Sequence, residues 1–223
     1  MANVFAPFGF QAIRRVDGAS WSGNVSVRKI AAANTHYFFK GDPVASLTTG
    51  YIDVVAPGSL PGTKQIAGIF VGCEYLSVAK GYVTWSPMFP GGDTTTDVIA
   101  YIIDDPNVLF AVQSNNSNTT ATAMGISYIG NNISYASVNT IGTSTAGNTL
   151  NGISGVYIDQ YTASDTIADL PFHVYDIPNV QTSGGAVGTA GGAVGNGYDP
   201  TTPYNIIYVS INSSDLRAPQ NGI

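Results

Sequence analysis

Short apolar runs recur along the whole chain, and turn-forming residues separate them. Gly41-Asp42-Pro43 and Asp104-Asp105-Pro106-Asn107 are two such separators. Runs rich in Val, Ile, Tyr and Phe that recur every ~8–12 residues between turns are typical of strands in a β-barrel or β-sandwich. The strands predicted in this way lie at residues 25–30, 37–39, 51–55, 66–71, 82–85, 98–103, 108–113, 124–129, 133–138, 155–158, 172–177 and 205–211.

The same pattern divides the chain into three parts. Residues 1–20 hold Phe, Pro and Gly too closely spaced for a regular helix or a central strand, so we expect an extended N-terminal arm. Residues 21–103 form a first β lobe, and residues 104–223 form a second β lobe with a C-terminal strand. The stretch 181–197 repeats Gly-Gly-Ala-Val-Gly, which favours a glycine-rich loop. The predicted fold class is all-β: an antiparallel β-barrel or sandwich body with an extended N-terminal arm.

Composition and charge support this prediction and argue against nucleic-acid binding. Charged residues make up 10% of the chain, where ~25% is usual, and Glu74 is the sole glutamate, so good helix formers are scarce. The net charge is −6, and residues 41–223 carry three cations and thirteen acids. Such an acidic body lacks the clustered cations that phosphate contact needs. A surface poor in Lys and Glu favours a protein that works inside an assembly.

The residues that carry chemistry are few and isolated. His36 and His173 have no His or Glu at the close spacing of local metal-site motifs. Cys73 lies in an apolar run, which favours a buried and inert thiol. Asp104 and Asp105 are adjacent, so they indicate a turn rather than the carboxylate pair of a glycosidase. No G-x-S-x-G or phosphate-loop motif occurs, although a triad built from distant residues stays open. We expect no enzyme activity, no catalytic residues, no metal and no cofactor.

The start of the chain lacks the charged and apolar regions of a signal peptide. No apolar run approaches the ~20 residues that a membrane-spanning helix needs. We therefore expect synthesis in a cytoplasm, with no membrane partner.

A series of short motifs runs in order along nearly the whole chain. As an ordered set these motifs resemble the capsid decoration (cement) proteins of tailed bacteriophages, although the Gly-Ala-Val repeat at 184–195 departs from that family. The motifs are Ala6-Pro7-Phe8-Gly9-Phe10, Arg14-Arg15, Asp17-Gly18, Trp21-Ser22-Gly23, Gly41-Asp42-Pro43-Val44, the run 66–72, Asp104-Asp105-Pro106-Asn107, Phe110-Ala111-Val112-Gln113, Gly152-Ile153-Ser154-Gly155-Val156 with Asp159, and Asn221-Gly222-Ile223.

The resemblance implies a structural virion protein that binds the outer capsid surface and stabilises contacts between major capsid protein subunits. The chain would be made in the cytoplasm of the bacterial host. The implied partners are the major capsid protein and further copies of the same chain, with a homotrimer as the first expectation and a dimer as the second.

Within this family expectation, the N-terminal arm is the candidate capsid-binding segment. Its candidate contact residues are Phe5, Phe8, Phe10, Arg14 and Arg15, because aromatic and arginine side chains are the usual interface hot spots. Two other classes stay open: another virion component such as a tail-fibre or spike adaptor, and a carbohydrate-binding β domain, which the Tyr-rich composition would suit.

Overall fold

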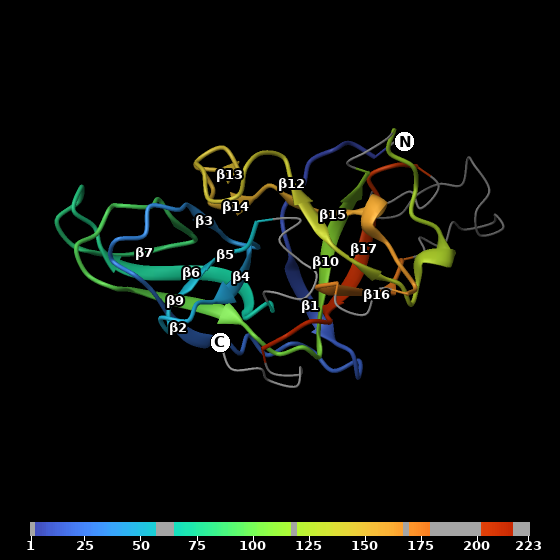
Figure 1. The fold of residues 1–223 in the computed structure, drawn as a ribbon, viewed down its shortest axis with the longest axis horizontal. Helices are drawn as coiled ribbons and strands as arrows, with labels where there is room; N and C mark the ends of the chain where they lie inside the picture. Colours follow the sequence, from blue (N-terminus) through green and yellow to red (C-terminus); the bar gives the residue numbers. More distant parts are fainter. Residues whose placement is uncertain (1–2, 57–64, 117–119, 167–169, 179–201, 216–223) are drawn as a thin grey trace.

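The computed structural model describes residues 3–56, 65–116, 120–166, 170–178 and 202–215. Within these residues the chain forms strands and two short 3-10 turns, with no α-helix, and its sheets form a nearly closed barrel. The all-β prediction is confirmed. Two lobes lie along the long axis of the molecule (Figure 1). The expected glycine-rich loop at 181–197 lies outside the described residues.

The first lobe is one antiparallel sheet with a small two-stranded ribbon over its inner face. Alternation along the strands sends one set of side chains to that inner face, where they bury a compact aromatic and aliphatic core that includes Phe38, Phe70 and Phe89. The ribbon pairs β3 (Phe38–Phe39) with β8 (Met88–Phe89). The sheet order is β2 (Ser26–Ile30), β9 (Val98–Ile103), β6 (Gly68–Leu76), β4 (Pro43–Ser46) and β5 (Ile52–Val54), with β7 (Val83–Ser86) also paired to β6.

The second lobe is a sheet centred on β10 (Val108–Asn115), which pairs with strands from three distant parts of the chain. One of them is β1 (Gln11–Arg15), so part of the expected N-terminal arm is a strand of this sheet. The pairing of β10 with β15 is parallel, and the other pairings are antiparallel. The sheet order is β11 (Asn132–Ile133), β16 (Phe172–Asp176), β17 (Ile206–Ile211), β10, β15 (Val156–Asp159) and β12 (Tyr135–Ser137).

Three short elements complete the described structure. The hairpin of β13 (Gly147–Asn148) and β14 (Ile153–Ser154) lies beside the first lobe near β3. The turns η1 (Ile126–Tyr128) and η2 (Gln160–Thr162) belong to the second lobe. The strand predicted at 124–129 is therefore wrong. Its apolar residues follow no strand pairing: Met124 is buried, and Ile126 points into solvent.

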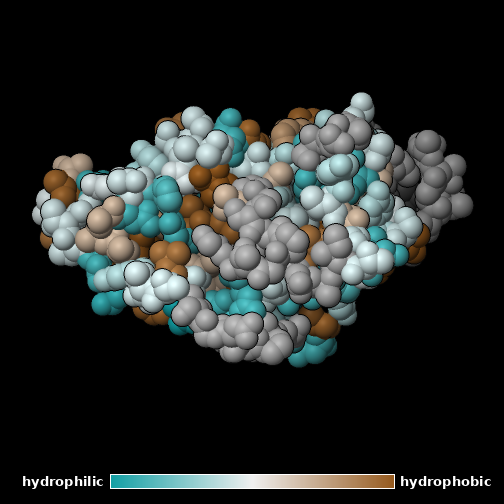
Figure 2. Space-filling view, viewed as in Figure 1, coloured by the Kyte–Doolittle hydropathy of each residue, from teal (hydrophilic) through white to brown (hydrophobic). Residues whose placement is uncertain are grey.

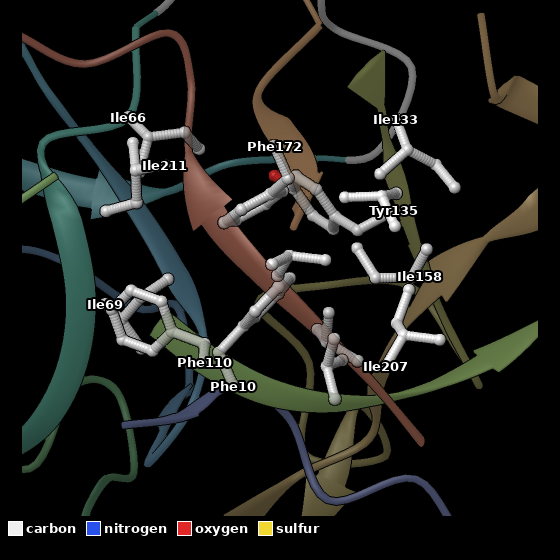
Figure 3. Close-up of a cluster of buried hydrophobic side chains, with 14 of the residues drawn as sticks. Phe10, Ile66, Ile69, Phe110, Ile133, Tyr135, Ile158, Phe172, Ile207 and Ile211 are labelled. Atoms are coloured by element: carbon white, nitrogen blue, oxygen red, sulfur yellow. The ribbon is translucent and has the colours of Figure 1, made fainter. Parts of the chain in front are cut away.

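Besides the core inside the first lobe, a second hydrophobic core is shared by the two lobes. Phe10 is only 3% exposed and lies at its centre, with its ring stacked on Phe172 at a centroid distance of 4.2 Å. Phe110 and Tyr135 approach the same ring edge-on (Figure 3). Ile66, Ile69 and other side chains of the first lobe belong to the same cluster. Pulling the lobes apart would therefore expose this core to water.

A buried carboxylate fastens the lobes where they join. Asp42, in the turn between β3 and β4, is 1% exposed. Its Oδ1 accepts a hydrogen bond of 2.5 Å from the Ser154 hydroxyl of β14, and its Oδ2 accepts one of 2.8 Å from the backbone N–H of Phe39. Burial raises the pKa of Asp42 to about 7, and the two hydrogen bonds only partly oppose this effect.

The N-terminal segment crosses this junction at very close range. The Phe10 N–H donates to the carbonyl of Gly41 at 3.0 Å, and the Gly9 N–H donates to the carbonyl of Val156 at 3.2 Å. Gly9 has a φ of 69°, and a Cβ at this position would lie 2.7 Å from the Cβ of Ser154. Only glycine allows this approach, which directs Phe10 into the core.

Replacing Phe10 with alanine should lower the free energy of unfolding by ~3–5 kcal/mol, because it leaves a cavity in the shared core. Phe8→Ala, which changes a half-buried ring in the same segment, is the matched control and should cost less. Urea unfolding of both variants checks this. Equal losses for the two variants would contradict the central place assigned to Phe10.

The Asp42 carboxyl should make stability depend on pH. The folded pKa of about 7 lies above the ordinary value of 3.8, so the folded protein keeps a proton that the unfolded chain releases between these values. The contribution of Asp42 to the free energy of unfolding should be greatest below about pH 4 and should fall by up to roughly 4 kcal/mol as the pH rises through about 7.

Asp42→Asn is the comparison variant, since its amide is uncharged and retains an acceptor for the Phe39 N–H and a donor for Ser154. The difference in unfolding free energy between wild type and variant, measured in urea at several pH values, should change across this window. A constant difference would show that Asp42 keeps the same charge in both states.

Candidate interaction surface

The five residues predicted to contact a capsid do not form one exposed patch. Phe10 lies in the core, as described above. Phe5 packs on Tyr157 and Tyr204, with both ring centroids 5.3 Å from its own. Phe8 is half-buried. Phe5 and Phe10 thus attach this segment to the protein's own second lobe.

The two arginines of this segment face carboxylates of their own chain. Arg15 Nη1 lies 2.6 Å from Asp105 Oδ2, and Arg14 Nη2 lies 3.9 Å from Asp176 Oδ2. The charges of both arginines are therefore largely offset by neighbouring acids. This segment remains a candidate contact, but its charges are no longer a reason to choose it.

The two histidines and the cysteine either contact neighbouring side chains or are buried. His36 Nδ1 lies 2.9 and 3.0 Å from the two carboxylate oxygens of Asp53, at an exposed position. His173 Nδ1 lies 2.9 Å from Asn132 Oδ1 on the neighbouring strand, and burial lowers its pKa. Burial raises the pKa of Cys73 to about 12, which keeps the thiol protonated and unreactive at neutral pH. Among the described residues no cluster of three or more His, Cys, Asp or Glu side chains could hold a metal ion.

A group of exposed apolar side chains lies on the first lobe, on the sheet face opposite its core. Strand pairing places side chains of β2, β9, β6 and β7 side by side there. Among them Val83 is 67% exposed and Trp85 is 59% exposed. Hydrophobic residues reach the surface among hydrophilic ones over this lobe, at the left of Figure 2. We call this surface the outer face; it includes Val27, Leu76, Val83, Trp85, Ile99 and Tyr101, together with Lys29, Glu74 and the exposed Asp97 beside Lys29.

The Trp85 ring lies over Gly72 of β6, where the absence of a side chain leaves room for it. A Cβ on Gly72 of β6 would lie 3.1 Å from Cζ2 of the Trp85 ring. The indole therefore lies against the backbone of β6 and presents its other side to solvent.

A second exposed apolar group stands at the tip of the β13–β14 hairpin. Leu150 is 97% exposed. Its N–H donates to Asn148 Oδ1 at 2.9 Å, and the Ile153 N–H donates to Asn151 Oδ1 at 3.0 Å. The Gly152 N–H donates to the Asn148 carbonyl at 2.8 Å, which closes the loop. These bonds fix the backbone that carries the leucine, so its side chain projects from a preorganised support.

No family model matches the chain, and comparisons with curated proteins and with solved structures gave no match. Among the described residues no helix is long and apolar enough to cross a membrane.

The sequence predicted a strand at 82–85 but not which of its two faces is exposed. Apolar and polar residues alternate along Val83-Thr84-Trp85-Ser86, yet in the structure Val83 and Trp85 are exposed and Thr84 is buried. Which strands lie beside it depends on pairing across the chain, so the complete face could not be assembled from the sequence. Leu150 gave no signal, since a lone leucine in a polar stretch is common on protein surfaces.

Proposed function

We propose that this chain is a non-enzymatic structural virion protein, which binds the outer surface of a tailed-phage capsid and stabilises contacts between major capsid protein subunits. The choice of partner comes from the resemblance of its ordered motifs to capsid decoration proteins. Exposed apolar side chains on rigidly held backbone, Leu150 above all, support a role in binding another protein.

The distribution of the ion pairs supports the same proposal. Arg14, Arg15 and Arg28 all lie within 4 Å of carboxylates of this chain. Charged residues make up only 10% of the sequence, so few unpaired charges are left to prevent the apolar surface from associating with other proteins. A protein with such a surface gains stability when a partner covers it, and bound copies stabilise whatever they bridge.

Three resemblance motifs also meet in one place, at the junction of the lobes. They are the segments that contain Gly9-Phe10, Gly41-Asp42 and Ser154. Because these motifs lie at the junction, we infer that they determine the fold. The capsid contact itself would then be made by surfaces that the motifs support.

Replacing Leu150 with serine should weaken binding to shells of the cognate major capsid protein about tenfold, since burying a leucine side chain contributes ~1.5–3 kcal/mol. Leu150→Met keeps an apolar side chain and is the matched control. Co-sedimentation of shells with increasing amounts of each variant measures the affinity. Unchanged affinity of the serine variant would remove the hairpin from the contact, and failure of the wild-type protein to bind shells would contradict the proposed function.

A further inference from the structure

The β13–β14 hairpin is tied to the first lobe through Lys40 and Asp42. The Lys40 N–H donates to the Gly152 carbonyl at 2.8 Å, and the Ser154 N–H donates to the Lys40 carbonyl at 3.0 Å. The Ser154 hydroxyl adds the bond of 2.5 Å to Asp42 Oδ1. One of the bonds that hold the hairpin therefore ends on a carboxyl group, and the state of that group affects how firmly the hairpin is attached.

The turn that carries Asp42 is anchored separately from the hairpin. The Gly41 N–H donates to the Phe70 carbonyl of β6 at 2.8 Å, and the Phe70 N–H donates to the Asp42 carbonyl at 2.9 Å. Strand β4, which follows directly, is paired with both β5 and β6. When the contact around the carboxyl is broken, the hairpin is therefore the part that moves away.

The surroundings of the carboxyl favour its neutral form. Asp42 is 1% exposed, and within the part of the chain that the structure describes it forms no ion pair. A buried carboxylate normally needs a paired cation as well as hydrogen bonds. In the neutral form Oδ2 still accepts from the Phe39 N–H, and a proton on Oδ1 can be donated to Ser154 Oγ. Neutral Asp42 therefore keeps both contacts without burying a charge.

Neighbouring titratable groups do not change charge together with Asp42. The side chain of Lys40 is exposed to solvent. The Tyr135 hydroxyl donates to the Val55 carbonyl at 2.7 Å, and burial, with the Asp42 charge as the smaller cause, raises the pKa of Tyr135 well above its ordinary value. Tyr135 therefore stays neutral while Asp42 ionises. The residues bonded to this turn from β3, β6 and β14 are uncharged: Phe39, Phe70 and Ser154.

We propose that the β13–β14 hairpin opens away from the first lobe as a unit, and that this opening is coupled to the ionisation of Asp42. In the closed form the carboxyl is buried and neutral. In the open form Ser154 has moved away, water reaches the carboxyl, and its proton passes to the solvent. The hairpin is then a pH-dependent switch built into the junction of the lobes, which is a property beyond capsid binding itself.

The closed form predominates because opening uncovers a buried ring. A Cβ on Gly147 of β13 would lie 2.6 Å from Cγ of Phe39, so the hairpin backbone lies directly against this ring. Phe39 is fully buried, and departure of the hairpin would bring part of its ring into water. This exposure disfavours opening. Amide hydrogen exchange nevertheless detects such rare local openings.

The direction of the pH effect follows from the two states of Asp42. Its pKa is about 7 in the closed form and returns towards the ordinary 3.8 when water reaches it. Between these values the open form has lost a proton that the closed form keeps, so each pH unit favours opening about tenfold. Below about pH 4 both forms are neutral and above about pH 7 both are ionised, so the equilibrium is constant in these ranges. Acid therefore keeps the hairpin closed.

The switch also bears on Leu150, and this consequence rests on the proposed function. Leu150 projects from the hairpin, so its direction is fixed in the closed form and changes when the hairpin opens. A capsid contact through Leu150 would select the closed form and would therefore be favoured by a neutral Asp42.

Hydrogen exchange of the free protein between pH 4 and 8 tests the coupling at the N–H groups of Lys40 and Ser154. After correction for the intrinsic pH dependence of exchange, opening should increase up to about a thousandfold between about pH 4 and 7 and then level off. Asp42→Asn should remove this rise, because its amide carries no titrating proton and keeps a donor and an acceptor. Asp17→Asn, which changes an exposed carboxylate, is the matched control and should behave as wild type.

Two further readouts keep the test decisive. Small additions of urea should hardly change exchange at Lys40 and Ser154, since a local opening exposes much less surface than global unfolding. The N–H groups of Tyr128 and Ile129, in and beside η1 of the second lobe, are a reference within the wild-type protein and should lack the pH-dependent rise. This reference serves even where Asp42→Asn does not fold.

Corrected exchange at Lys40 and Ser154 that is equal at every pH would overturn the proposal. So would the same rise in a folded Asp42→Asn variant, or a dependence on urea equal to that of global unfolding. These measurements use the protein without capsids, so the switch and the proposed function can fail separately.

Discussion

The hydrogen bond from Ser154 to the buried Asp42 carboxyl holds together parts of the chain that are 112 residues apart. The same carboxyl accepts from Phe39 and so fixes the turn between β3 and β4. That turn offers the Gly41 carbonyl to Phe10 and sets the path of the N-terminal segment. The aromatic core forms only when Phe10 follows this path. Because a buried carboxyl without partners is costly, loss of either hydrogen bond should destabilise the junction.

The packing of the two lobes determines which apolar surfaces stay exposed to solvent. The inner faces of the two sheets are used for the cores, and the N-terminal aromatics and arginines attach their own segment to the second lobe. The outer face of the first sheet and the tip of the β13–β14 hairpin are left with apolar side chains in solvent. Ser154 of the hairpin is bonded to Asp42, so the same junction that joins the lobes also fixes the support of Leu150. The fold and the proposed contact at Leu150 thus depend on one set of contacts.

The sequence was sufficient for the local features and insufficient for those set by distant contacts. Strands at 98–103 and 108–113 follow from β-branched runs between turns, and both are present. The run at 124–129 has similar composition but forms a 3-10 turn, because no neighbouring strand pairs with it. Phe10 was expected to face a partner, but it is buried. Its burial depends on a turn far along the chain, so neighbouring residues did not reveal it. The outer face needed the strand pairing, which adjacent residues do not encode.

The central claim is that this protein acts by covering the outside of a capsid. Electron cryo-microscopy of cognate shells incubated with the purified chain tests it most directly. The account predicts extra density of two lobes on the outer shell surface, with each copy touching more than one capsid subunit. Shells without this density, or density confined to the tail, would contradict it.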